Sequence, residues 1–474
     1  MRFDSLPLAL TLLIGAHDAL ALAAPRAPRA LHVPLVRRAA AERTAEEWGL
    51  WAKEQKNVLE GKYSGDAARK RAEGMNLIVN QNADSSYYGS LALGTPATAY
   101  NVILDTGSSD LWLADSACTT GCDQITTFNP DSSSSFKNLS TAFSITYGSG
   151  QAAGVLGTDV VQMAGFEVNE QVFGVCSVVS SGLLNEPVSG LLGLAWQSIA
   201  SSGATPFWEN LYQKNAWDQP VMAFQLTRYQ NDSRAAALEP GGTFTMGNVN
   251  SSLYTGDIDY QDIPTSTPTY WTLPLKTLTV NGNSITLASG SSSYAAIDTG
   301  TTLIGGPTDQ VAAIFAQIPN SAAGTGNYQG YYLYPCDTTV SVTLSFGGKD
   351  WSISPADFQL AQVSSSQCLG AFFEFSSSST APSWIVGDTF LKNVYSVFRA
   401  SPASIGFAAL SETAVAMNGA TGTVPSPTIG SVSASVTGSG RSASAAQSIV
   451  MERGARTAVL LSALMTAAVG VLVL

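Results

Sequence analysis

Between about residues 76 and 410, short alternating or continuously apolar runs are separated by Gly, Pro, Asn and Ser. Representative runs are SLALG at 90–94, FSITY at 143–147 and VSVTLSF at 340–346. Alternation with a period of two between turn-forming residues predicts β-strands. The clearest helical pattern lies at 308–318. The pattern therefore predicts an all-β body with few helices.

Two segments of this body resemble each other, and each is followed by a second signature. The first segment, VILDTGSS, contains Asp105, and the second, AIDTGTT, contains Asp298. At nearly the same distance after each Asp, an apolar pair is followed by glycine, at Gly193 and Gly387. Motifs repeated at matched spacing argue for two homologous β-lobes. The expected lobes are residues 72–262, the N-terminal lobe, and residues 263–411, the C-terminal lobe.

The first 71 residues have the features of segments that are removed from a secreted protein. An apolar run at 6–14 precedes small-residue sites, so residues 1–21 are expected to be a signal peptide. A membrane helix is the alternative, but the run is far shorter than the roughly 20 residues that span a bilayer. A basic stretch then ends at the site Arg69-Lys70-Arg71, which predicts a pro-segment at 22–71.

Beyond residue 411 the composition changes twice. Residues 412–446 are rich in Ser, Thr, Ala and Gly and poor in large apolar groups, which predicts a disordered stalk. Residues 447–474 hold a polar stretch and then an uncharged run that begins at Thr457, and the small-residue cluster 444–446 precedes them. Ser442 and the cluster 438–440 are alternative attachment positions. This order is typical of a glycosylphosphatidylinositol attachment signal, so we expect a membrane attachment through a lipid anchor. A retained C-terminal membrane helix is the alternative interpretation.

Charge and histidine content exclude several classes of function. The chain has 23 Lys and Arg against 35 Asp and Glu, and basic residues concentrate before residue 71. A body this acidic is a poor candidate for nucleic-acid binding, which depends on cations that neutralise phosphates. Both histidines, His17 and His32, lie in segments expected to be removed. The mature protein would have no Ser-His-Asp triad and no His-ligated metal, and we expect neither metal nor cofactor.

The repeated Asp-Thr-Gly suggests acid–base chemistry by paired carboxylates. Hydrolysis of a peptide bond needs a base that activates water and an acid that protonates the carbonyl oxygen. Two carboxylates held close together cannot both ionise, so a pair that shares one proton supplies both roles. An isolated Asp-Thr-Gly is usually only a turn. Two copies, each matched to a later glycine signature, are much more specific, and they nominate Asp105 and Asp298 as the catalytic pair.

On these motifs the sequence resembles the pepsin family of aspartic proteases over about 76–410, and within it the secreted or lipid-anchored, yapsin-like fungal enzymes. The resemblance implies a bilobal pepsin-like fold with a cleft between the lobes and a hairpin flap above it. It also implies an endopeptidase that acts on protein or peptide substrates at acidic pH and is made as a zymogen. We also expect a monomer.

The resemblance assigns supporting roles to the rest of both motifs. The threonine after each Asp matches a residue that links the lobes beneath the site. The glycine that follows allows the tight turn, and the next hydroxyl residue matches one that hydrogen-bonds the outer carboxylate oxygen. These supporting residues are Thr106, Gly107, Ser108, Thr299, Gly300 and Thr301.

Further resemblances concern the flap and the substrate pocket. Tyr147, which Gly148 follows, matches the tyrosine of the flap, and Trp112 matches its indole partner. Ile103 and Leu191 are candidates for the wall of the pocket. The alternative for these aromatic and apolar residues is a place in the core, where such side chains are usual.

Five cysteines and three acceptor sequons fit a secreted glycoprotein. The resemblance implies disulfides Cys118–Cys122 and Cys336–Cys368, and it leaves Cys176 as a buried thiol. The sequons predict glycosylation of Asn138, Asn231 and Asn250. The expected location is the secretory pathway and then the extracellular face of the plasma membrane or the cell wall.

Two other classes of function compete with the protease. A catalytically silent cell-surface binding protein on the same fold would usually lack one Asp or an adjoining glycine, and both motifs are intact. An acid glycosidase also uses two carboxylates, but its chemistry does not explain the duplicated Asp-Thr-Gly.

Overall fold

The computed structural model describes residues 72–376, 381–420, 422–426 and 431–439, and its regular structure is mostly strand. The all-β prediction is therefore confirmed. The expected signal peptide, the pro-segment and the apolar tail lie outside the described residues. Among the residues that the structure describes, no helix is long and apolar enough to cross a bilayer.

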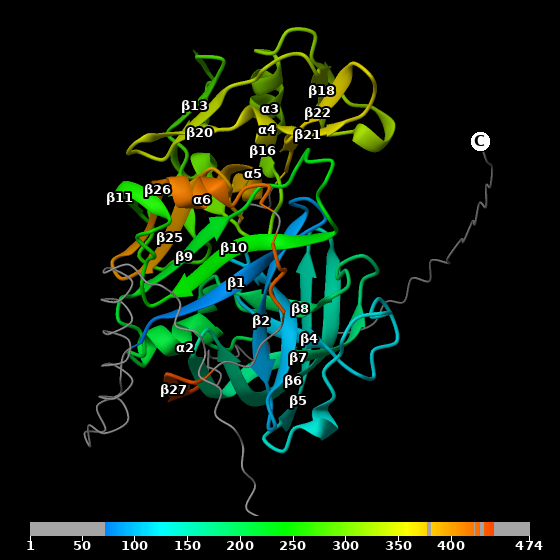
Figure 1. Cartoon of the computed structure of the whole chain (residues 1–474), viewed down its shortest axis with the longest axis vertical. Helices are drawn as coiled ribbons and strands as arrows, with labels where there is room; N and C mark the ends of the chain where they lie inside the picture. The colour runs from blue at the N-terminus through cyan, green and yellow to red at the C-terminus, as the bar shows by residue number, and fades with distance from the viewer. Residues whose placement is uncertain (1–71, 377–380, 421, 427–430, 440–474) are drawn as a thin grey trace, which may run out of the picture. The chain divides into compact units, whose positions relative to one another are not determined.

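A 14-stranded sheet contains the strands of the N-terminal half and also strands from the end of the chain (Figure 1). Because β9 pairs with β10 on one side and with β25 on the other, this sheet joins both halves of the sequence. β27 (Ala434–Thr437) pairs with β7 outside the main order. The main order is β11 (Tyr254–Asp262), β26 (Ala403–Leu410), β25 (Val394–Ala400), β9 (Val221–Leu226), β10 (Leu238–Met246), β1 (Gly74–Gln81), β2 (Ser86–Leu93), β3 (Thr98–Asp105), β8 (Val188–Gly193), β4 (Leu111–Ala114), β7 (Phe166–Val179), β6 (Gly150–Met163) and β5 (Lys137–Tyr147).

Three smaller sheets belong to the C-terminal half. The first has the order β12 (Thr272–Pro274), β15 (Tyr294–Ile297), β24 (Trp384–Val386), β16 (Ile304–Gly306) and β23 (Phe372–Glu374). The second has the order β14 (Asn283–Ser284), β13 (Thr277–Val280), β19 (Val342–Ser345) and β20 (Asp350–Ile353). The third has the order β17 (Ala322–Ala323), β18 (Tyr332–Pro335), β22 (Gln367–Gly370) and β21 (Gln359–Gln362).

The described helices are short, as the sequence pattern predicts. They are α2 (Phe207–Gln213), α3 (Thr308–Phe315), α4 (Pro355–Phe358), α5 (Asp388–Leu391) and α6 (Glu412–Ala416). α3 confirms the helical pattern at 308–318, although it ends three residues earlier than expected. In Figure 1, α3 and α4 lie with the C-terminal sheets, whereas α2 lies beside β27.

The two halves repeat one strand topology around the two Asp motifs. In the N-terminal half, β3 pairs in parallel with β8, β8 pairs antiparallel with β4, and β4 pairs in parallel with β7. In the C-terminal half, β15, β24, β16 and β23 repeat the same three pairings in the same order. The duplicated motifs therefore sit on a duplicated structure, which is the bilobal arrangement that the repeat predicts.

In each half, the glycine of the second signature, Gly193 or Gly387, packs directly against the backbone of the loop that follows the Asp. A Cβ on Gly193 would lie 2.4 Å from the backbone nitrogen of Asp110. A Cβ on Gly387 would lie 2.0 Å from the carbonyl oxygen of Thr301. Any other residue would push the Asp loop away from its strand, so the spacing seen in the sequence has a steric cause.

The extension that follows β26 differs from the sequence-based expectation of a disordered stalk at 412–446. It begins with α6, whose Ser411 N-cap accepts a hydrogen bond from the Ala414 amide. Farther on, β27 pairs in parallel with β7. Composition predicted disorder because the segment has few large apolar residues, but a strand on a sheet edge is held largely by its backbone.

A buried ionic cluster joins elements that are distant in the sequence. The ammonium of Lys392, which is 1% exposed, lies 2.7 Å from Asp84 and 3.0 Å from Asp357. Arg228 donates two hydrogen bonds to the same Asp357 carboxylate, at 2.8 and 2.5 Å. The turn before β2, the strand end after β9 and helices α4 and α5 are thus held through one set of charges.

We predict that Lys392→Met lowers the free energy of unfolding by about 3–5 kcal/mol, because two buried carboxylates lose their shared cation. The matched control is Lys137→Met, whose partner Glu170 is exposed, and which should not change stability measurably. Urea denaturation at constant m-value measures both. Equal stability of Lys392→Met and the parent protein would contradict the stabilising role of the cluster.

Candidate active site

Asp105 and Asp298 stand at equivalent positions of the repeated topology. Asp105 is the last residue of β3, and its carbonyl oxygen accepts a hydrogen bond from the Leu194 amide at 2.7 Å. Asp298 directly follows β15, and its amide donates to the carbonyl oxygen of Val386 at 3.0 Å. The two side chains are only 5% and 8% exposed. Each Asp is thus held where the parallel pair of its lobe ends.

The threonines that follow the two aspartates bind the loops to each other crosswise. The Thr106 amide donates to Thr299 Oγ1 at 3.1 Å, and the Thr299 amide donates to Thr106 Oγ1 at 3.0 Å. Each hydroxyl also donates across the interface, Thr106 to the carbonyl oxygen of Ile297 at 2.8 Å and Thr299 to that of Leu104 at 2.7 Å. Both threonines are almost fully buried, so these bonds are shielded from water.

The glycines of the two motifs bring the carboxyl groups together. A Cβ on Gly107 would lie 2.5 Å from Asp298 Oδ2, and a Cβ on Gly300 would lie 2.3 Å from Asp105 Oδ1. Each glycine backbone therefore packs directly against the carboxyl group of the other lobe. A larger residue at either position would separate the two carboxyl groups.

Each carboxyl group is held by its own loop in the same way. The Gly107 amide donates to Asp105 Oδ1 at 2.7 Å, and the Ser108 hydroxyl donates to Asp105 Oδ2 at 2.5 Å. The Gly300 amide donates to Asp298 Oδ1 at 2.8 Å, and the Thr301 hydroxyl donates to Asp298 Oδ2 at 2.7 Å. The supporting residues that the resemblance nominated are thus brought together around the pair.

The pair favours a state in which one carboxyl group is protonated. Burial, followed by the negative charge of Asp298, raises the pKa of Asp105 well above its usual range. The hydrogen bonds from Ser108 and Gly107 act in the opposite direction but do not cancel the effect. Such a pair can donate a proton from one carboxyl group and accept one at the other.

Tyr147 and Trp112 contact each other near the paired carboxyl groups of Asp105 and Asp298, which we call the dyad. Tyr147 ends β5 opposite Gly150, the first residue of β6, so the two strands form a hairpin at this point. The Trp112 indole N–H donates to the Tyr147 hydroxyl at 2.8 Å. Burial, and then the charge of Asp105, raises the pKa of Tyr147. A Cβ on Gly148, at the hairpin tip, would meet no other atom within 4 Å.

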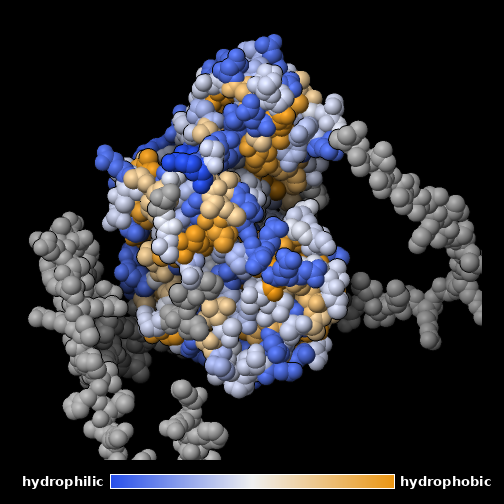
Figure 2. All heavy atoms as spheres, turned by 45° about the vertical axis from the view of Figure 1, so that its right-hand side comes forward, coloured by the Kyte–Doolittle hydropathy of each residue, from blue (hydrophilic) through white to orange (hydrophobic). Residues whose placement is uncertain are grey.

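Ile103 and Leu191 pack in the same hydrophobic cluster as Tyr147 and Trp112. Leu191 is buried, whereas Ile103 is partly exposed. In the space-filling view, the surface is hollowed between the upper part of the body, which holds the C-terminal sheets, and the lower part (Figure 2).

The sequence of residues 86–410, more than half of the chain, matches the model of the eukaryotic aspartyl protease family. The chain belongs to this family. It is 50% identical to Major aspartyl peptidase 1 of Cryptococcus neoformans var. grubii, over 73% of this chain and 72% of that protein. It is 36% identical to an aspartic protease of Phaffia rhodozyma, over 76% and 85% of the two chains. It is 33% identical to pepsin A of Sus scrofa, over 79% and 94%.

The protein is therefore an aspartic endopeptidase that acts on peptide substrates, as the resemblance implied. The range that matches the family model runs from the start of β2 to the end of β26.

Two residues near the dyad of this protease were missed by the sequence reasoning. Burial, and then the charges of Asp298 and Asp105, raises the pKa of Tyr270, so this phenol lies within electrostatic reach of both. Burial also raises the pKa of Asp388, which follows Gly387 and donates its amide to the carbonyl oxygen of Thr301 at 2.8 Å. Asp388 stands directly after the second glycine signature, and that position was the available signal.

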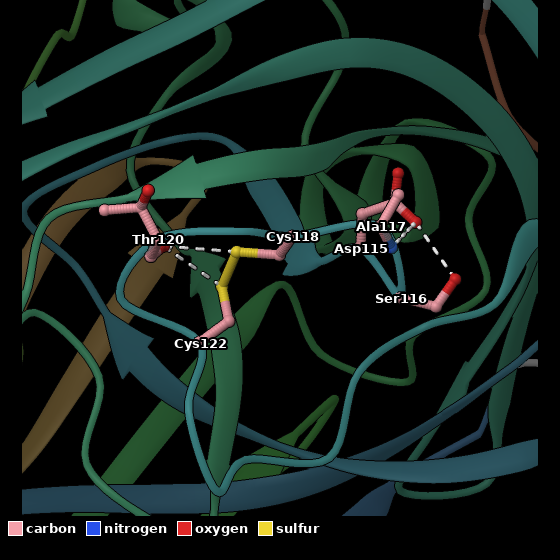
Figure 3. The surroundings of a disulfide bond; sticks show 6 residues. All are labelled: Asp115, Ser116, Ala117, Cys118, Thr120 and Cys122. Carbon is pink, nitrogen blue, oxygen red and sulfur yellow. Dashed lines mark hydrogen bonds between the residues drawn. A yellow bond between two sulfur atoms is a disulfide. The ribbon is translucent and has the colours of Figure 1, made fainter.

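The two predicted disulfides are present. Cys118–Cys122 closes a small loop after β4 (Figure 3). Cys336–Cys368 joins the residue after β18 to β22. In the first loop, Asp115 Oδ1 accepts hydrogen bonds from the Ala117 amide at 3.1 Å and the Ser116 hydroxyl at 3.3 Å. Cys176 is a buried free thiol, and burial raises its pKa far above the usual value, which disfavours a reactive thiolate.

We predict that Thr106→Val lowers the free energy of unfolding by about 2–4 kcal/mol, because it leaves the Thr299 amide and the Ile297 carbonyl buried without partners. Thr106→Ser is the matched control, since it keeps the hydroxyl and both bonds. The two urea midpoints at neutral pH give the comparison. If the serine variant is as unstable as the valine variant, the lost methyl group and not the crossed hydrogen bonds explains the effect.

Proposed function

We propose that Asp105 and Asp298 are the catalytic pair of this endopeptidase. The observation that carries the proposal is the close, symmetric approach of two buried carboxyl groups, each packed against the glycine of the other lobe. A substrate water bound between them would lose a proton to the ionised carboxylate as its oxygen attacks the peptide carbonyl carbon. The protonated carboxyl group would give its proton to the carbonyl oxygen.

The tetrahedral intermediate then breaks down with the same two groups. One carboxylate removes a proton from a hydroxyl of the intermediate, the carbonyl re-forms, and the C–N bond breaks. The leaving nitrogen receives the proton from the other carboxyl group. The pair returns to one shared proton, so no other acid or base is needed. The two carboxyl groups would be kept at a fixed separation by Thr106, Thr299, Gly107 and Gly300. Their outer oxygens would be hydrogen-bonded by Ser108 and Thr301.

We assign Tyr147 to a flap that closes over the bound peptide. Its place at the end of β5, its bond to Trp112 and the open space at Gly148 support this role. Closure would position the scissile bond and exclude water. Ile103 and Leu191 would then provide apolar surface for the substrate beside the flap.

The electrostatics of the dyad support the proposed acidic optimum, because they account for a loss of activity as the pH rises. Because the pKa of Asp105 is raised, the proton that the pair shares is retained at acidic pH and is lost as the pH rises through that raised pKa. Above it both groups are ionised, and the carbonyl oxygen has no proton donor. The rate constant kcat/KM would therefore fall on the alkaline side.

We predict that Asp105→Asn and Asp298→Asn each reduce kcat/KM by at least about a thousandfold, because an amide neither holds nor shares the proton. Ser109→Ala is a control outside the carboxyl contacts, since the Ser109 hydroxyl bonds to the Trp196 carbonyl. Peptide cleavage between pH 3 and 7, with and without a statine-type inhibitor, is the measurement. Full activity of either asparagine variant would contradict the assignment of the catalytic pair. Inactivity of the parent protein at every pH would support a silent binding protein instead.

The enzyme is proposed to be made as a zymogen, exported and anchored. The basic stretch up to Arg71 precedes the acidic body, and the amide and carbonyl of Ala72 both bond to the segment 216–218. The small-residue cluster, the polar stretch and the apolar run of the tail support a lipid anchor on the extracellular side. We further propose glycosylation and a monomeric state; the sequon residues Asn138, Asn231 and Asn250 all lie at least partly exposed.

We predict that the surface-held enzyme begins at or just after Ala72 and lacks residues 457–474. Terminal peptide mapping by mass spectrometry tests both ends, and a glycosidase-sensitive mass tests the sequons. Phosphatidylinositol-specific phospholipase should release active enzyme from intact cells. Recovery of peptides from 457–474 in the membrane-bound protein would show that the tail is retained as a membrane helix.

A further inference from the structure

The end of β7 that holds Phe166–Asn169 has a backbone edge that β4 does not reach. β4 pairs with β7 only at Gly174–Cys176, whereas β6 covers the other side of β7 along nearly its whole length. β27 fills the remaining edge in parallel register, from Ala434 opposite Phe166 to Thr437 opposite Asn169. The chain's own extension therefore supplies the strand that the sheet lacks.

Specific contacts at both ends of β27 fix its register. Before the strand, the Ser433 amide donates to the Gly165 carbonyl oxygen at 2.6 Å. After it, the Gly438 amide donates to the Asn169 carbonyl oxygen at 2.6 Å, and a Cβ on Gly438 would lie only 2.8 Å from the Glu170 carbonyl oxygen. The glycine is thus required for this approach to the sheet.

Side chains of the lobe add to these backbone contacts. The Ser435 hydroxyl donates to Glu167 Oε1 at 2.7 Å and accepts from Asn169 Nδ2 at 2.9 Å. Val436 is 7% exposed and belongs to the main hydrophobic core, whereas the neighbouring Val432 is 41% exposed. The strand therefore contributes one residue to the core of the N-terminal lobe.

A buried amide receives the end of the extension. Asn210 of α2 is 1% exposed, and its Nδ2 donates to Gln171 Oε1 at 2.9 Å and to the Thr205 carbonyl oxygen at 3.2 Å. These bonds fix the orientation of the amide group, and its Oδ1 accepts from the Ser439 amide at 2.8 Å. The lobe thus binds the chain as far as Ser439.

The path to β27 is also bound to the body. The Arg228 amide donates to Asn418 Oδ1 at 3.0 Å, and the Tyr229 hydroxyl donates to the Ala420 carbonyl oxygen at 2.6 Å. Val424, like Leu238, packs against a buried hydrophobic cluster of the N-terminal lobe. The extension is therefore held at several separate places between Asn418 and Ser439.

We propose that the edge of β7 together with Asn210 is a docking site for the chain's own segment 433–439, and that docking makes the α2 surface the side of the enzyme that faces the lipid membrane. This inference rests on the proposed anchor. With the segment docked, only residues 440–446 separate the enzyme from the expected attachment signal, a span of at most about 25 Å. A free extension from Leu410 would reach roughly 120 Å.

The test uses the full chain on the surface of intact cells. Val436→Asp and Gly438→Val should undock the segment, and Val432→Asp is the matched control because it places the same charge at an exposed position four residues away. Hydrogen exchange of the enzyme released by phospholipase should show the amides of 433–439 exchanging at least about tenfold more slowly in the parent protein and the control than in the two undocked variants. Exchange in β5 and β6 that is as slow as in the parent protein, together with retained peptidase activity, would show that the variants fold.

Tether length is measured by energy transfer from a fluorophore on Gln213→Cys, an exposed position of α2, to a dye in the membrane. Mean end-to-end distances scale with the square root of tether length, so the mean distance should rise about twofold in Val436→Asp and Gly438→Val but not in Val432→Asp. Because energy transfer falls steeply with distance, transfer in those two variants should drop by much more than this factor. Fast exchange of 433–439 in the parent protein would overturn the docking. Unchanged transfer in variants shown to be undocked would overturn the membrane-facing surface.

The experiments test the proposed anchor and the docking independently. If phospholipase does not release the parent enzyme and transfer is absent from every variant, the anchor and the membrane-facing surface are both wrong. Enzyme collected from the medium would then show by exchange whether the docking itself holds.

Discussion

Four buried hydrogen bonds between Thr106 and Thr299 and the two loops around them hold the halves of this protease face to face. Each hydroxyl accepts from the amide of the opposite threonine and donates to a carbonyl of the opposite lobe. The strands on both sides deliver their Asp residues to this one crossing point. A change of even a few tenths of an ångström there would move both carboxyl groups, because the glycines next to them leave no free space.

Burying two carboxyl groups next to each other costs electrostatic free energy, and the same closeness allows them to exchange a proton with a substrate. Burial and the neighbouring charge of Asp298 raise the pKa of Asp105, and this raised pKa is the energetic cost of the arrangement. Hydroxyl and amide donors limit it without removing it, which leaves the pair able to exchange a proton with a substrate. The remote cluster around Lys392 shows the opposite solution, in which buried carboxylates receive a cation and stay fixed.

The sequence was most informative where a physical requirement acts twice. The repeated Asp-Thr-Gly and the later Gly193 and Gly387 reflect the same steric demand in each lobe, so the fold and the pairing of the two aspartates could be predicted together. Tyr270 could not, because its proximity to the dyad depends on how distant segments fold and no local pattern marks it. The docked extension was missed for a related reason. Backbone pairing to a sheet edge leaves almost no trace in composition, and Val436 is the one core residue of β27.

The docked strand also affects whether the protein aggregates at high local concentration. An exposed sheet edge presents unpaired amides and carbonyls that can pair with the edge of a neighbouring molecule and begin aggregation. Covalent attachment gives β27 a high effective concentration at β7, so it excludes strands from other chains that must arrive by diffusion. If the proposed anchor confines many copies of the protease to one surface, they would meet far more often than in dilute solution. Covering this edge from within the chain keeps such encounters from becoming intermolecular sheets.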